Sequence, residues 1–140
     1  MHHIVYWSHA TRPMSPIELV ALLIEARTYN EAAGITGALV YDGTQFMQVL
    51  EGEEAAIQDL YTRIARDSRH RDAFKLADKA IAERTFVNWS MAFRELSPGE
   101  FADITGYTSP EQWEQLEFGS ASVDTLLLER MRGVLIGKND

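Results

Sequence analysis

Short runs of alternating apolar and polar residues, and longer runs with apolar residues at helical spacing, follow one another along this chain. Alternation predicts strands, because successive side chains of a strand point to opposite faces; a spacing of three or four predicts amphipathic helices. The pattern predicts helices over 16–33 and 53–66. It predicts strands over 3–8, in the two arms of a hairpin within 35–52, and over 74–82 and 89–96.

The first predicted helix has a start signal and a stop signal. Ser15 is followed by Pro16 and, three positions after the serine, by Glu18, which is a capping box with proline at the first helical position. Gly34 is typical of the residue that ends a helix. The apolar stripe of this helix consists of Leu19, Leu22, Leu23 and Ala26, and Asn30 continues it one turn later.

Between the two arms of the hairpin stands Asp42-Gly43, a dipeptide typical of two-residue turns. Such a turn would place Tyr41 opposite Thr44 and Gly37 opposite Gln48. The amide of Gln48 would then share its face with three apolar side chains, those of Leu39, Phe46 and Leu50. A buried amide without partners costs about 1–3 kcal/mol, so Gln48 needs a hydrogen-bond partner on that face.

The order strand-helix-strand-strand-helix-strand-strand predicts an α+β, ferredoxin-like fold with one added strand and both helices on one face of the sheet. The helix side would carry Ile4, Tyr6, Leu39, Phe46 and Gln48. The opposite face would carry Val5, Trp7, Ala38, Val40, Met47 and Val49, and it is also apolar. We expect the core domain to span 1–96. The segment 97–140 would form helices in the same compact unit, among them an amphipathic one over 122–136 that covers the second face or is shared with another subunit.

Composition narrows the class of protein. The chain has 140 residues, a net charge of −8 and no cysteine. The acidic balance disfavours nucleic acid and anionic membranes as partners, and the absence of cysteine excludes disulfides, thiolate nucleophiles and cysteine-ligated metals. No apolar run is long enough for a membrane span and there is no signal-peptide pattern, so we expect a cytoplasmic protein.

Four polar side chains converge on the helix-side face: Tyr6, Ser8, Asn30 and Gln48. Taken singly, each has an ordinary structural explanation, such as a bond to a backbone carbonyl or a helix cap. Together they predict a polar pocket between sheet and helices, filled by a planar polar ligand or by a closed network of hydrogen bonds.

The charged residues and His residues carry less information. Arg63 and Asp67, at helical spacing, read as a surface ion pair, and 69–71 as a basic cluster that compensates the helix dipole or contacts phosphate. Glu51, with two further carboxylates at 53 and 54, reads as a solvated helix start. The chain has no nucleotide-binding loop, zinc-protease motif or nucleophile elbow, and its His residues lack the spacing of a metal site.

An ordered set of short motifs extends from about Ile4 to Phe93. It consists of Val-Tyr-Trp-Ser at 5–8, Asn30 before Gly-Ile-Thr-Gly at 34–37, Phe-Met-Gln-Val-Leu-Glu-Gly at 46–52, Arg63, Asp67 with Arg69-His70, Arg84 with Phe86, and Asn-Trp-Ser-Met at 88–91. Each motif alone is weak, but the ordered set resembles the BLUF domains, which are blue-light sensors that use flavin. One departure from the family pattern is Tyr29, since many members carry a polar residue before the asparagine.

This resemblance implies a noncovalently bound flavin, FAD or alternatively FMN, between the two helices. Tyr6 would donate an electron and a proton to the photoexcited ring, and Gln48 would link the tyrosine hydroxyl to the ring's N5 and O4 edge. Rotation or tautomerisation of the amide would leave a new hydrogen bond to the ring carbonyl and a small red shift. Trp89 and Met91 would change exposure or contacts during signalling. The implied flavin-contacting residues are Tyr6, Ser8, Asn30, Gln48, Arg63, Asp67, His70 and Met91.

The segment 97–140 is too short for a cyclase or diesterase domain. We therefore expect a stand-alone sensor without enzymatic activity, which forms a homo-oligomer and passes its signal to an unidentified protein partner. Two other classes stay open. A small ferredoxin-like enzyme of the acylphosphatase type and a ligand-free interaction module would both be colourless, unlike a flavoprotein.

Overall fold

The computed structural model describes residues 1–87, 89–105, 128, 130–133 and 135. The described strands form one sheet in the order β4-β1-β3-β2-β5, in which only β2 and β5 pair in parallel. The predicted ferredoxin-like α+β fold with a fifth strand is confirmed. The elements are β1 (His2–Ala10), α1 (Pro16–Ala33), β2 (Thr36–Tyr41), β3 (Gln45–Gly52), α2 (Glu54–Ala65), β4 (His70–Ala80), β5 (Ala92–Glu95) and α3 (Pro98–Thr105).

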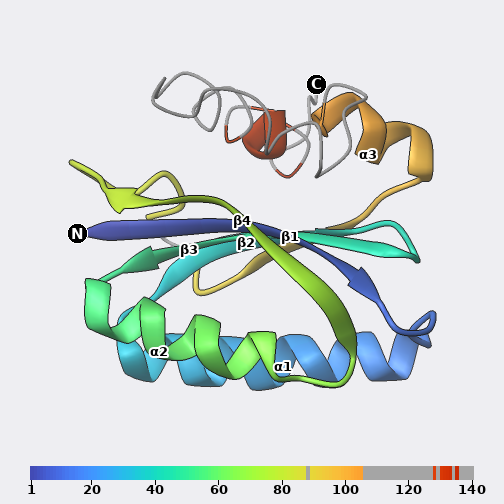
Figure 1. Ribbon diagram of the computed structural model, residues 1–140, viewed down its shortest axis with the longest axis horizontal. Coiled ribbons are helices and arrows are strands. Elements are labelled where there is room, and N and C mark those ends of the chain that lie inside the picture. Colours follow the sequence, from blue (N-terminus) through green and yellow to red (C-terminus); the bar gives the residue numbers. More distant parts are fainter. Residues whose placement is uncertain (88, 106–127, 129, 134, 136–140) are drawn as a thin grey trace.

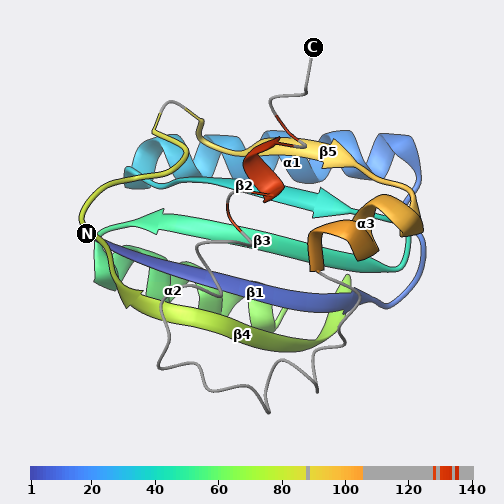
Figure 2. The ribbon, with the colours of Figure 1, turned by 90° about the horizontal axis from the view of Figure 1, so that it is seen from above.

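The sheet separates two layers (Figure 1). Helices α1 and α2 lie side by side on one face, as predicted, and α3 lies on the other face together with the described residues near 130. Seen from above, β3 and β1 occupy the middle of the sheet, with β4 and β5 at its two edges (Figure 2). Among the described residues, no helix is long and apolar enough to cross a membrane.

Helix α1 begins and ends as its sequence signals predict. The Ser15 hydroxyl accepts a hydrogen bond from the Glu18 backbone N–H at 3.2 Å, and the Glu18 carboxylate accepts one from the Ser15 N–H at 2.8 Å. These two bonds satisfy N–H groups that a helix start would otherwise leave unpaired. Gly34 ends the helix in the left-handed region, at φ 70°.

The register of the β2–β3 hairpin differs by two residues from the predicted register. Leu39, not Gly37, lies opposite Gln48, and Tyr41 lies opposite Phe46. A shift of two preserves the alternation of side chains, whereas a shift of one would have moved every side chain to the other face. Gln48 therefore stays on the predicted face, and β1 on the other side of β3 places Tyr6 directly opposite it.

The cause of the altered register is the side chain of Asp42. Its carboxylate accepts hydrogen bonds from the backbone N–H groups of Thr44 at 2.9 Å and Gln45 at 2.8 Å. These bonds place Asp42 before the turn instead of within it, a common role for aspartate. Gly43 then takes the first central position at φ 99°, where a residue with a Cβ would be strained.

The alternation produces two buried clusters, one on each face of the sheet. The cluster beneath α1 and α2 contains Ile4, Leu19, Leu23, Ile35, Leu39, Tyr41, Phe46, Leu50, Ile57 and Met91. The cluster on the second face contains Val5, Trp7, Ala38, Val40, Met47, Val49, Leu76, Phe86, Leu96, Phe101, Leu128 and Met131. Phe101, Leu128 and Met131 thus join the second face from the segment after residue 97, while most of the helix predicted over 122–136 lies outside the described residues.

The two outer strands differ from their predicted bounds. β4 begins at His70, before the predicted start, and pairs with β1 with two irregularities in register. β5 is shorter than predicted and begins only at Ala92. The two residues predicted as its start are held by separate hydrogen bonds. The Trp89 carbonyl accepts from the Gly37 N–H at 3.0 Å, and the Ser90 carbonyl accepts from the side-chain amide of Asn30 at 2.7 Å.

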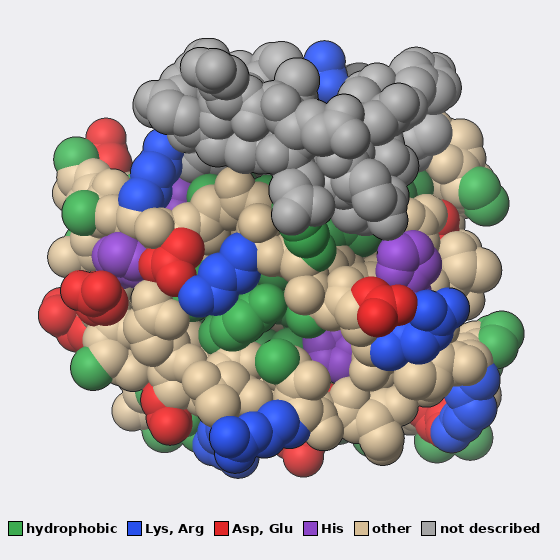
Figure 3. All heavy atoms as spheres, in the orientation of Figure 1, with side chains coloured by type: hydrophobic (Ala, Val, Ile, Leu, Met, Phe, Trp, Pro, Cys, Tyr) green, Lys and Arg blue, Asp and Glu red, His purple; other side chains and the backbone are tan. Residues whose placement is uncertain are grey.

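The β4 edge carries ion pairs such as Lys75–Asp78, and acidic and basic side chains lie side by side over this face (Figure 3). Charges on an edge strand discourage pairing with another sheet.

Candidate functional site

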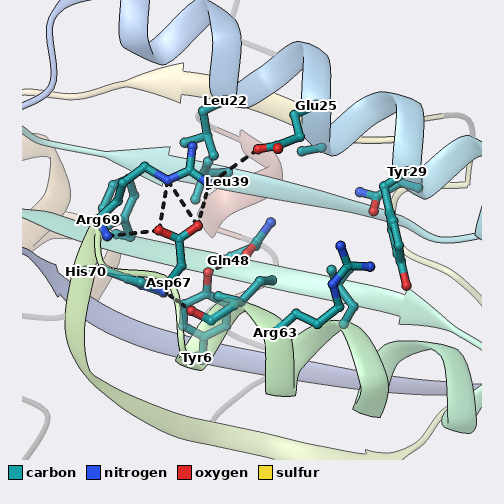
Figure 4. A pocket seen from close by; sticks show the side chains of 15 residues that line it. Tyr6, Leu22, Glu25, Tyr29, Leu39, Gln48, Arg63, Asp67, Arg69 and His70 are labelled. Atoms are coloured by element: carbon teal, nitrogen blue, oxygen red, sulfur yellow. Dashed lines mark hydrogen bonds and ion pairs between the residues drawn. The ribbon is translucent and has the colours of Figure 1, made fainter.

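A cavity of about 230 Å³, open to the surface, lies between α1, α2 and the sheet. This volume is just below the roughly 300–1,000 Å³ that small-molecule sites occupy. Figure 4 shows the side chains around it. The lining residues are Tyr6, Leu22, Glu25, Ala26, Tyr29, Asn30, Leu39, Phe46, Gln48, Leu60, Arg63, Ile64, Asp67, Arg69 and His70.

Tyr6 and Gln48 form the floor of this cavity. The Tyr6 hydroxyl donates a 2.5 Å hydrogen bond to Oε1 of Gln48, and both side chains are buried. The Gln48 amide nitrogen donates in turn to Sδ of Met91 at 3.4 Å. A thioether sulfur is a weak acceptor, so the amide has a strong bond at one end and a weak bond at the other. This asymmetry leaves the NH₂ end of Gln48 suited to a better acceptor.

The phenol of Tyr6 is held in its neutral form. Burial raises the pKa of Tyr6 far above its usual range, and the nearby Tyr61 and Asp67 raise it further. The Tyr61 ring meets the Tyr6 ring edge-on, with 5.5 Å between their centroids. At neutral pH Tyr6 is therefore a hydrogen-bond donor, as its bond to Gln48 requires.

His70 lies next to Tyr6, with 6.0 Å between the ring centroids, and is hydrogen-bonded to Ser8. The Ser8 hydroxyl and Nδ1 of His70 are 2.8 Å apart, and Nε2 of the same ring is hydrogen-bonded to the Ile64 carbonyl. Because a carbonyl can only accept, Nε2 carries the proton, and Nδ1 of the neutral ring accepts from Ser8. His70 lines the cavity, whereas Ser8 reaches it only through His70.

The charged residues at the mouth of the cavity do not form the ion pair that the sequence predicts. Asp67 pairs with Arg69, whose Nε lies 2.9 Å from the carboxylate, and not with Arg63. Arg69 also reaches Glu25 of α1 at 3.3 Å, so it links the two sides of the mouth (Figure 4). Arg69 lowers the pKa of Asp67 mainly through this side-chain hydrogen bond. The guanidinium of Arg63 lies 4.6 Å above the Tyr29 ring, a cation–π contact.

The structure separates Met91 from Trp89. Met91 is 2 % exposed and contacts Gln48 on the helix side of the sheet. Trp89 packs against the cluster on the second face, with its ring 5.7 Å from that of Phe86. Asn30 lines the cavity while its amide donates to the Ser90 carbonyl between them. Of the proposed site residues, Trp89 alone therefore packs in the cluster on the far side of the sheet.

Sequence reasoning missed or misread several residues. Glu25 and Arg69 were not recognised as partners, because they are 44 positions apart along the chain. The interpretation of Glu51 as part of a solvated helix start was wrong. Glu51 lies in β3 and is fully buried, and its carboxylate accepts hydrogen bonds from residues of the β4–β5 connection. A signal was present for Glu51, since its position in an alternating strand predicts that it faces the second cluster.

Comparisons with known proteins identify the family. A family model described as sensors of blue light using FAD matches residues 1–92. The photoactivated adenylate cyclase subunit beta of Euglena longa is 38% identical over 89 residues, which are 63% of this chain and 10% of that protein. Subunit alpha of Euglena gracilis is 37% identical over 83 residues, 59% of this chain and 8% of that protein. This chain thus matches about a tenth of the length of these relatives.

Solved structures give the same result for the fold. The dark-state structure of the BLUF protein BlrB superposes with a TM-score of 0.70 at 27% identity and covers 96% of both chains. A bacterial light-regulated adenylyl cyclase superposes with a TM-score of 0.70 at 28% identity, over 94% of this chain and 40% of the cyclase. With the family model matching most of the chain, the sequence and the fold agree: this chain belongs to the BLUF family of blue-light sensors that use flavin.

Proposed function

We propose that this chain senses blue light through a flavin held noncovalently between α1 and α2, with Tyr6 as the electron and proton donor and Gln48 as the switching amide. The observation that carries the proposal is the arrangement of the Gln48 side chain. Its oxygen accepts a 2.5 Å bond from Tyr6, and the one hydrogen-bond partner of its nitrogen among the described residues is the sulfur of Met91, at 3.4 Å. A polar ring edge in the cavity would provide the better acceptor that the nitrogen lacks.

The residues around the cavity fit a flavin. Apolar side chains from α1, α2 and the sheet supply walls for a flat aromatic ring, and Asn30 and Gln48 supply amides for its polar edges. Arg63 has a cation–π contact but no salt bridge to a carboxylate among the described residues, which leaves its guanidinium able to pair with an acceptor on the ligand. The His70 ring, which is hydrogen-bonded to Ser8, lies next to Tyr6 with 6.0 Å between the ring centroids.

The proposed chemistry follows from the groups that the chain itself provides. A bound flavin supplies blue-light absorption and an acceptor for one electron and one proton. Tyr6, neutral and buried, can release both together without leaving a charged phenol in the core. Once Tyr6 no longer donates to Oε1, the Gln48 amide is free to rotate or to tautomerise. When the electron and the proton have both returned to Tyr6, Gln48 is left with a different set of hydrogen bonds.

We propose FAD as the flavin, since the family description names it, with FMN as the alternative. FMN is the alternative because the similar structure of Klebsiella pneumoniae BlrP1 is one with FMN and cyclic diGMP. Arg69, which lines the cavity, would supply a guanidinium for a phosphate group of either molecule.

We propose that the described core acts as a sensor and not as an enzyme, and that it signals to a protein partner. In the relatives named above, cyclase activity belongs to proteins that are much longer than the matched segment. A homo-oligomer and a cytoplasmic location stay predictions. The net charge of −8 continues to argue against nucleic acid and anionic membrane as partners.

The test is an absorption spectrum of the purified protein, reconstituted with FAD, before and after blue light. We expect a yellow protein whose flavin band shifts slightly to the red and returns in the dark, because a new hydrogen bond to the ring carbonyl lowers the transition energy. A colourless protein that releases phosphate from an acyl phosphate would favour the small-enzyme alternative. A colourless protein without turnover, even after reconstitution, would favour an interaction module.

A further inference from the structure

A buried carboxylate outside the cavity holds the connection between β4 and β5. Glu51, near the end of β3, is 0% exposed. Its two oxygens accept three hydrogen bonds, from the backbone N–H groups of Thr85 (2.6 Å) and Phe86 (3.0 Å) and from the Thr36 hydroxyl (3.0 Å). An ionised carboxylate is expensive to bury without partners, and here the partners come from the start of that connection.

Arg84, next to these backbone donors, strengthens the same junction. Its guanidinium donates to the Thr36 hydroxyl oxygen at 2.8 Å, to the Glu51 carbonyl at 3.2 Å and to the Gly34 carbonyl at 2.9 Å. Since Arg84 donates to the Thr36 oxygen, the proton of that hydroxyl is directed at the Glu51 carboxylate. Residues 84–86 are therefore fixed by five hydrogen bonds, of which four go to Thr36 of β2 or Glu51 of β3 and one goes to Gly34 at the end of α1.

The far end of the same connection carries the sulfur that contacts Gln48. The carbonyl of Met91 accepts a 2.9 Å hydrogen bond from Nε of Arg27, and the carbonyl of Ser90 accepts from the Asn30 amide at 2.7 Å. Both donors belong to α1. The connection is thus held by the sheet at its start and by α1 at its end, and Glu51 lies only three residues after Gln48 on β3.

A carboxylate suits this position better than an amide. Glu51 accepts on both oxygens from N–H groups that face it, Thr85 on one and Phe86 on the other. A glutamine has one acceptor and one donor, so one of these N–H groups would face an NH₂ group and lose its partner. A glutamine at 51 would therefore loosen residues 84–86 while it preserves the size of the side chain.

We propose that Glu51 is a positioning residue for the photoreaction: by holding residues 84–86 it sets the place of Met91 against the Gln48 amide. The inference rests on the proposed function, in which Gln48 changes its hydrogen bonds. A Met91 sulfur that is fixed beside the Gln48 amide leaves this side chain little room to rotate, both in the light reaction and in the dark return. Loosening the connection lowers this restriction and speeds the dark recovery.

The experiment compares Glu51→Gln with Glu53→Gln, an exposed glutamate two positions later that makes no side-chain cap bond. Both variants are reconstituted with FAD, and the methionine methyl groups are labelled with carbon-13. The chain has five methionines, so the Met91 signal is assigned with Met91→Ala. We expect Glu51→Gln to shift or broaden the Met91 signal and to speed dark recovery by about fivefold or more, and Glu53→Gln to change neither.

A double variant separates positioning from general destabilisation. If Glu51 acts through Met91, Glu51→Gln changes the recovery less than about twofold in a Met91→Ala background. An unchanged Met91 signal, or an equal effect of Glu51→Gln with and without Met91, would overturn the proposal.

If Glu51→Gln does not fold, Thr36→Val removes one donor to the same carboxylate, and its effects should have the same direction and smaller size. A wild type without red shift would refute the proposed function itself, and the Met91 signal would still report on the positioning.

Discussion

The Tyr6 hydroxyl lies 2.5 Å from the Gln48 amide oxygen because the antiparallel register of β1 and β3 places these two residues opposite one another on the helix side of the sheet. Both are central-strand residues, held by ladder hydrogen bonds on either side. The contact is thus built between two strands that each have a hydrogen-bonded neighbour on both sides.

Replacing the tyrosine removes the donor from this pair. Tyr6→Phe should fold and bind flavin, because the ring keeps its place in the core, but the light-induced red shift should disappear. The buried Gln48 oxygen loses its partner, so the free energy of unfolding should fall by about 1–3 kcal/mol. Difference spectra and urea unfolding check both parts. Tyr61→Phe, in the ring that packs against Tyr6, is the matched control and should keep the shift.

Gln48→Leu removes the amide from the other side of the pair. Leucine fits the apolar surroundings of this face, so circular dichroism should match that of the wild type. Without an amide no hydrogen bond can change partners, and illumination should leave the flavin band in place. A normal photocycle in this variant would show that the amide is not the switch.

Alkaline titration tests the burial of Tyr6. Its pKa is raised above the ordinary value of 10.0, first by burial and then by Tyr61 and Asp67. The folded protein therefore keeps the proton that the unfolded chain releases near pH 10, and the stability that Tyr6 contributes is present below that pH and lost as pH rises above it. The wild type should lose stability above about pH 10 more steeply than Tyr6→Phe. Equal slopes in urea unfolding would argue that the phenol is not buried.

Asp67 should have the opposite dependence on pH. Arg69, through a side-chain hydrogen bond, holds its pKa below the ordinary value of 3.8. The stability that this carboxylate contributes is present above pH 3.8 and lost as pH falls through its lowered pKa. Relative to Asp67→Asn, the wild type should therefore be more stable at about pH 7, and the difference should shrink towards about pH 3. Thermal unfolding of both proteins across this range measures it.

Residues whose placement on the sheet depends on alternation alone were predicted correctly. Gln48 was assigned to the helix side from period-two spacing, and the error of two residues in the hairpin did not matter because two is the period. The register itself depended on the Asp42 side chain, whose hydrogen bonds compete with the turn that Asp-Gly favours.

Contacts between distant segments were beyond this kind of prediction. Glu51 was read with its neighbours at 53 and 54, yet its backbone partners Thr85 and Phe86 lie 34 and 35 positions away. Asp67 was matched with Arg63 at helical spacing, but the helix ends at Ala65, so Asp67 is free to turn toward Arg69. The spacing of residues along a helix predicts side-chain partners within that helix, but not for residues beyond its end.

The alternation of side chains in β3 brings the Gln48 amide close to the second face of the sheet. Met47 and Val49, the immediate neighbours of Gln48, belong to the cluster on the second face, where Phe101 and Met131 pack. A displacement of the strand that accompanies a new bond at Gln48 reaches that face through a single peptide unit. The Gln48 amide and the cluster on the second face are therefore separated by a single layer of backbone, and the residues that cover this cluster are the first to lie beyond it.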